Sequence, residues 1–178
     1  MTQAASKSPP QGSAFWRFSL RFYRAPEVAS ACIQMQDAAG VDVNLLFFLL
    51  WNASLKRRFS ASDVAAVDRH IASWRQSAVI PLRNVRRVLK SAPFAVEPGA
   101  VEVFRTKVKG LELEAERLQQ EVLYDYARAA APGEDAASAA EAARANVAAY
   151  ETFIGRPFPK PAVDAVLGAF EKLKDENG

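Results

Sequence analysis

The sequence predicts an all-α protein: one helical bundle of six or seven helices. Apolar residues recur three and four positions apart along two long segments, about 62–91 and 100–130, as on one face of a helix. No segment shows a convincing strand pattern. Residues 45–51 are apolar on every side, which indicates a buried central helix at about 43–56, and the run is far shorter than the roughly 20 residues of a membrane span.

The chain of 178 residues is long enough for one domain with its own core. Residues 1–12 predict a disordered leader, because no apolar run follows their lysine as it would in a secretory signal. We expect a single helical domain over 13–173 and a short tail at 174–178. Within that domain, 127–149 forms an alanine-rich arm and 155–161 a proline-rich connector.

The first helices have recognisable ends. Ser13 is a candidate N-cap for the first helix, and Gly40 is expected to end the second because glycine readily adopts a positive φ. Asp42 can then cap the buried helix by accepting hydrogen bonds from its free N–H groups. The expected order is helix, tight turn, buried helix.

The two long segments predict an antiparallel hairpin, because a short loop joins them. The apolar face of the first continues across Pro81, so we expect a kink there, with the carbonyl of Ser77 losing its partner. The second carries a heptad seam, which packs inside the hairpin or, alternatively, joins two copies in a structural homodimer. The seam consists of Val101, Phe104, Val108, Leu111, Ala115, Leu118 and Val122.

Positive charge gathers at the loop end of this hairpin. Between 83 and 109, seven cations stand against two carboxylates, a net charge of +5. With the loop centred near residue 95, the cations of the two helices lie side by side, which favours an anion-binding or acidic-partner site. The alternatives are a solvated face whose arginines pair with internal carboxylates, or arginine stems packed over the edge of the core. The candidate residues are Arg83, Arg86, Arg87, Lys90 and Arg105, with Lys107 and Lys109 nearby.

A second polar group surrounds the turn before the buried helix. It consists of Gln36, Asp37, Asp42 and Asn44. One interpretation is that these residues cap helices and satisfy backbone groups. The other is a polar pocket in which a helical enzyme acts on an anionic, phosphate-bearing substrate. A magnesium-dependent enzyme of that kind needs acidic clusters on facing helices, and only half of such an arrangement is visible.

The sequence offers little catalytic chemistry. His70 is the single histidine and Cys32 the single cysteine, too few for a usual zinc site, and no glycine-rich phosphate loop is present. Glu112 and Glu116 lie one turn apart without the Glu-x-x-His motif of di-iron bundles. We therefore assign no catalytic residue, metal or cofactor. A lone cysteine also fits a reducing compartment, so we expect a cytoplasmic protein.

Three stretches together carry a family resemblance: FYRAPEVASACIQMQDAAGVDVNLLFFLLW, WRQSAVIPLRNVRRVLK and VKGLELEAERLQQ. They resemble a family of small, mainly proteobacterial proteins catalogued only as a domain of unknown function. The resemblance covers about 14–125. It implies a helical cytoplasmic protein without a known cofactor. The motifs that carry it are Gln36-Asp37, Gly40, Asp42-Val43-Asn44, Pro81-Leu82-Arg83, Arg86-Arg87 and Lys90.

The leading functional hypothesis is a non-enzymatic binding or adaptor protein. Its basic hairpin end would meet an acidic partner: a protein surface, an RNA or an anionic ligand. The hypothesis rests on the local net charge of +5, and it would be overturned if these side chains were already paired to internal carboxylates. The alternatives are the pocket enzyme and the homodimer through the heptad seam, and no membrane-spanning segment is expected.

Overall fold

The computed structural model describes residues 12–91 and 93–175, and it confirms the all-α fold. Helices α4, η1 and α5 follow one another directly, so these residues form seven helical segments, as the sequence predicts. The predicted leader, apart from Gly12, and residues 176–178 of the predicted tail lie outside the described residues. The helices are α1 (Ala14–Tyr23), α2 (Val28–Ala39), α3 (Val43–Ser54), α4 (Ala61–Trp74), the π-helical turn η1 (Arg75–Val79), α5 (Ile80–Ser91), α6 (Pro98–Ala130), α7 (Ala139–Ile154) and α8 (Lys160–Asp175).

Helix α3 is the centre of the core, as the sequence predicts. Every residue from Asn44 to Ala53 is buried, and α3 contacts α1, α6 and α7. Asp42 is its N-cap, and Gly40 ends α2 with a φ of 74°. The tight turn between α2 and α3 therefore has the predicted chemistry, and it fixes where Asp42 enters the core.

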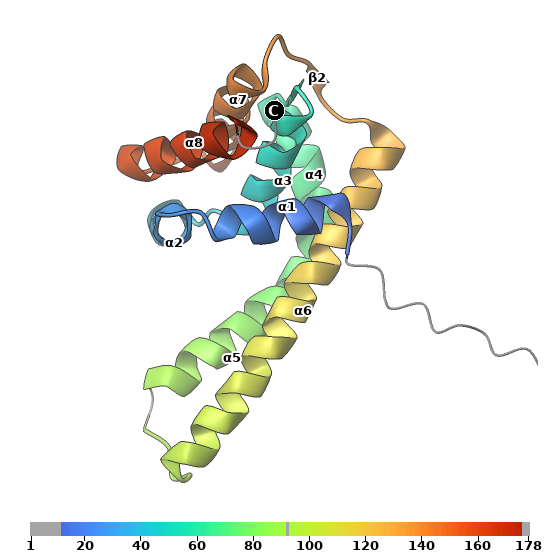
Figure 1. Cartoon of the computed structure of the whole chain (residues 1–178). Coiled ribbons are helices and arrows are strands. Elements are labelled where there is room, and N and C mark those ends of the chain that lie inside the picture. Colours follow the sequence, from blue (N-terminus) through green and yellow to red (C-terminus); the bar gives the residue numbers. More distant parts are fainter. Residues whose placement is uncertain (1–11, 92, 176–178) are drawn as a thin grey trace, which may run out of the picture.

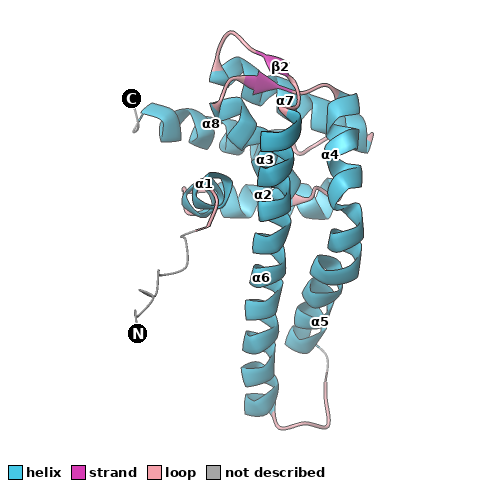
Figure 2. Cartoon of the chain, turned by 90° about the vertical axis from the view of Figure 1, so that its right-hand side faces the viewer, coloured by secondary structure: helices cyan, strands magenta, loops and turns pink. Residues whose placement is uncertain are grey.

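The hairpin is the most unusual feature of the shape. Helix α5 and the first half of α6 leave the body and project from it as two antiparallel helices (Figures 1 and 2). Helix α5 contains no fully buried residue, although it packs along α6. A third element does not cover this pair in the described part of the chain, so both outer sides of the hairpin are surface.

The irregularity predicted at Pro81 lies one turn earlier in the structure. Residues Arg75–Val79 form a π-helical turn, in which the N–H of Ile80 donates to the carbonyl of Arg75. An inserted residue of this kind shifts the hydrogen-bond register of a helix locally, and such turns often occur at functional sites. Arg75 is the first residue of this turn, and its side chain reaches Asp42 at the start of α3.

The alanine-rich arm is docked. It divides into the end of α6 and the start of α7, whose buried alanines and Val147 pack closely against α3. The two-residue strands β1 (Arg57–Arg58) and β2 (Glu134–Asp135), which the sequence did not predict, pair antiparallel beside α7. Among the described residues, no helix has both the length and the apolar character that crossing a membrane requires.

Candidate functional site

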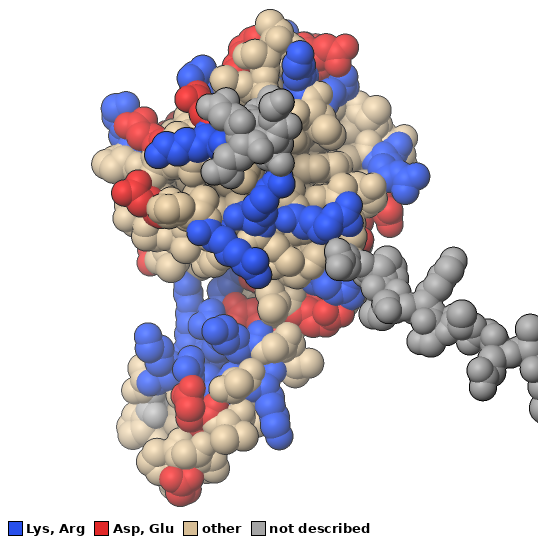
Figure 3. Space-filling model, in the orientation of Figure 1, with Lys and Arg blue, Asp and Glu red and all other residues tan. Residues whose placement is uncertain are grey.

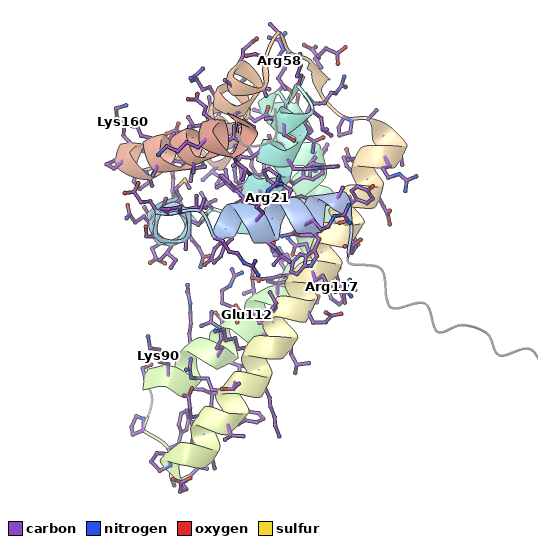
Figure 4. The ribbon with its side chains drawn as sticks, in the orientation of Figure 1. Arg21, Arg58, Lys90, Glu112, Arg117 and Lys160 are labelled. Atoms are coloured by element: carbon purple, nitrogen blue, oxygen red, sulfur yellow. The ribbon has the colours of Figure 1, made fainter. Side chains whose placement is uncertain are left out.

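An ion-pair network joins the two helices of the hairpin. Arg83 donates from Nε to Glu112 Oε1 at 3.3 Å and from Nη2 to Glu116 Oε1 at 2.7 Å. Arg86 donates to both oxygens of Glu112. The Glu112 side chain is only 7% exposed and lies between α5 and α6 (Figure 4). Two of the predicted partner-binding arginines are therefore engaged inside the protein.

This pairing corrects the expected neighbourhood of the arginines. A loop centred near residue 95 places Arg83 beside the basic residues around 107, but its guanidinium meets Glu112 and Glu116 farther along α6. Arginine side chains are long, and a carboxylate attracts them where a neighbouring cation repels them. The pKa of Arg86 is raised overall, mainly by its hydrogen bond to Glu112, although burial and the nearby charge of Arg105 act in the opposite direction.

Burial makes this network costly to disturb. Desolvation raises the pKa of Glu116, although the hydrogen bond and charge of Arg83 act in the opposite direction. Charged groups in such a site are favourable only while their partners remain in place. We therefore assign Arg83, Arg86, Glu112 and Glu116 a structural role in holding the hairpin together.

The other three predicted hairpin cations lie outside this network. Arg87 comes within 3.9 Å of Asp37, and both side chains are more than half exposed. Arg105 pairs with Glu102 on its own helix at 2.7 Å. Lys90 is exposed and forms no ion pair with any residue that the structure describes. Among the five predicted cations, Arg87 and Lys90 are the two that are exposed.

The predicted polar pocket is only partly formed by the predicted residues. Gln36 and Asp42 line a cavity of about 300 Å³ between α2, α4, η1, α5 and α7. Asp37 lies outside it on the surface, and Asn44 is buried, where it accepts a hydrogen bond from Gln120. The rest of the lining consists of Gly40, Val41, Asp68, Arg75, Val79, Ile80, Arg83, Tyr150 and Phe153.

The charges of this cavity are balanced within the protein. One nitrogen of Arg75 lies 2.5 Å from Asp68 and 3.3 Å from Asp42. The other oxygen of Asp42 caps α3, accepting from the N–H groups of Asn44 and Leu45. Burial alone would lower the pKa of Arg75, but the two aspartates raise it overall. A carboxylate bound to helix N–H groups and to an arginine fits capping better than catalysis.

Neither His70 nor Cys32 contributes a reactive centre to this cavity. Cys32 is buried, and burial raises the pKa of its thiol to about 12. His70 is exposed and packs against the ring of Tyr126, with 4.8 Å between ring centroids. Across the described residues, histidine, cysteine and acidic side chains do not gather into a cluster that could hold a metal ion.

A family model described as "Protein of unknown function (DUF2390)" matches residues 14–123. The chain belongs to this family. No curated protein and no solved structure matches the chain. The matched region runs from α1 through most of α6, so the hairpin and its ion-pair network lie inside the DUF2390 region, whereas α7 and α8 lie outside it.

The sequence interpretation missed one basic element of this DUF2390 protein. Arg17 and Arg21 of α1 and Arg24, its C-cap, follow one another at spacings of four and three, and all three are exposed. That spacing is itself a signal, because it places three side chains on one side of a helix. Figure 3 shows Lys and Arg gathered over α1 and over the hairpin on the same face of the molecule.

Proposed function

We propose that this protein is a non-enzymatic binding or adaptor protein that meets an acidic surface of a partner protein. The contact would be made by its basic face, which we define as Arg17 and Arg21 of α1 and its C-cap Arg24, with Arg87 and Lys90 of α5. The continuation of exposed positive charge from α1 onto the hairpin carries this proposal (Figure 3). A buried free cysteine also fits the cytoplasm as the compartment.

The net charge of the hairpin supports an acidic partner even after its internal pairing is counted. Seven cations between 83 and 109 stand against Glu97 and Glu102, and the structure adds Glu112, Glu116 and, beside Arg87, Asp37. The balance falls from +5 to +2 and keeps its sign. A surface of one sign attracts an oppositely charged partner and increases its association rate.

A protein fits this surface better than RNA. Phe94 and Val96 are exposed in the loop that follows Lys90 and Ser91 at the end of α5. Mixed cationic and apolar surface is typical of protein interfaces, whereas binding to a phosphate backbone depends mainly on charge. The sequence also lacks a recognisable RNA-binding module.

An affinity pull-down from native lysate tests this proposal. Arg87→Glu/Lys90→Glu is expected to lose a protein that the wild type retains, because two attractive charges become repulsive. Arg156→Glu/Lys160→Glu makes the same change of net charge at exposed positions near the start of α8, away from the hairpin (Figure 4 labels Lys160). That control is expected to retain the partner, which mass spectrometry then identifies.

Three other outcomes of the pull-down would contradict the proposed contact. Recovery that nuclease treatment abolishes would point to RNA and overturn the protein partner. Equal recovery by the wild type and both variants would show that the basic face is an ordinary solvated surface. Equal loss in both variants would show an effect of net charge alone.

A further inference from the structure

The side of the hairpin opposite its ion pairs is apolar and uncovered. We call this the apolar face, and its large side chains are between 38% and 59% exposed. The predicted seam on α6 is therefore split: Val108 and Ala115 are buried, Val101 is half-buried, and the other four seam residues are exposed. The apolar face consists of Val85, Val88, Phe104, Leu111, Leu118 and Val122.

Helical geometry places these side chains on one side of the hairpin. Successive helical residues are about 100° apart. On α6, Glu112 therefore lies on one flank of the Val108–Ala115 line and Leu111 on the other. On α5, Arg86 reaches Glu112. Val85 lies about 100° around the axis of α5 from Arg86, on the side away from Glu112. In an antiparallel pair both apolar flanks then fall on the same side of the hairpin, opposite the ion-pair network.

We propose that a second copy of this chain covers the apolar face. Two amphipathic helices bury only the surface between them, whereas two such hairpins packed face to face form a four-helix bundle with a closed core. A two-fold axis makes the same patch serve both copies. This contact is independent of the acidic partner, because the basic face lies on the opposite side of the hairpin and stays accessible.

Charge complementarity sets the orientation of the two copies. Lys107 lies four residues before Leu111 and Glu114 three residues after it, and both border the apolar face on its outer edge. When two α6 helices run antiparallel about Leu111, Lys107 of each copy lies beside Glu114 of the other. The axis also places Phe104 of one copy against Leu118 of the other. A parallel arrangement would instead place Lys107 of one copy beside Lys107 of the other, and Glu114 beside Glu114, so that like charges repel.

Sedimentation equilibrium between about 1 and 100 µM tests the contact. The wild type is expected to dimerise, and Leu111→Asp to weaken the dimer at least ~100-fold, because two central apolar anchors are lost per dimer. Leu113→Asp is the matched control: Leu113 is 51% exposed against 59% for Leu111, but it lies on the opposite side of α6. Both residues are exposed, so circular dichroism is expected to show unchanged helicity.

A charge exchange tests the orientation. Lys107→Glu is expected to weaken the dimer, and adding Glu114→Lys to restore it, because the antiparallel pairs are then rebuilt with reversed signs. A wild type that remains monomeric at 100 µM would overturn the proposal. So would a Leu111→Asp variant that dimerises normally, or a Leu113→Asp variant that dissociates equally. Failure of the charge exchange alone would overturn the antiparallel orientation.

Discussion

Replacing Arg75 with methionine is expected to lower the free energy of unfolding by about 3 kcal/mol or more at neutral pH. The Arg75 side chain is 17% exposed and is bonded to Asp42 and Asp68. Methionine keeps much of the apolar stem but leaves two carboxylates facing each other without a cation. Urea denaturation followed by circular dichroism measures the loss.

Two further variants separate this ion pairing from general damage to the helix. Arg69→Met changes an exposed arginine of α4 and is expected to leave the denaturation midpoint close to the wild type. Arg75→Met/Asp68→Leu removes one of the two unpaired carboxylates and is expected to recover part of the lost stability. If Arg75→Met were as stable as Arg69→Met, Arg75 would not hold the turn before α3 in place.

The variant Glu112→Gln is expected to lower the free energy of unfolding by roughly 2–3 kcal/mol. Glu112 is the carboxylate that both Arg83 and Arg86 share, and it is almost completely buried. An amide keeps the shape but loses the charge and one acceptor oxygen, so Arg86 loses one of its two hydrogen bonds and the negative charge that it faces. Because α5 has no fully buried residue, its amide protons are expected to exchange faster in this variant.

Glu102→Gln provides the matched control on the same helix. Glu102 pairs with Arg105 at 2.7 Å, but its side chain is 60% exposed, and surface ion pairs contribute little to stability. We expect almost no change in the denaturation midpoint or in the amide exchange of α5. Equal effects of the two substitutions would mean that the shared carboxylate has no special role in joining the hairpin.

The backbone of this protein was largely predictable from local signals. The all-apolar run indicated the buried α3, and apolar periodicity indicated the two long helices of the hairpin. Cap chemistry located the turn at Gly40 and Asp42. These features depend on residues close together in the chain, where propensity and periodicity are informative.

The site was less predictable because it depends on long side chains and distant contacts. Glu112 and Glu116 were recognised only as acids on their own helix, whereas the structure pairs them with Arg83 and Arg86. The pairing of β1 with β2 joins residues more than 70 positions apart, so no local sequence pattern predicts it. The heptad seam was visible, but a pattern of spacing does not show which of its positions face solvent.

The two sides of the hairpin therefore have different chemistry. On one side, carboxylates neutralise Arg83 and Arg86 and leave Arg87 and Lys90 exposed. On the other side, apolar side chains at heptad spacing have no cover in the described chain. A hairpin with these two sides can join two copies and still present positive charge to a partner.

Zero-length carbodiimide crosslinking in native lysate, followed by mass spectrometry, tests the proposed binding role most directly. The reagent joins a lysine amine only to a carboxylate in direct contact, and Lys90 has no ion-pair partner among the residues that the structure describes. The account predicts that Lys90 becomes linked to aspartate or glutamate of another protein. Lys90 linked only to carboxylates of its own chain, with no second protein recovered, would contradict it.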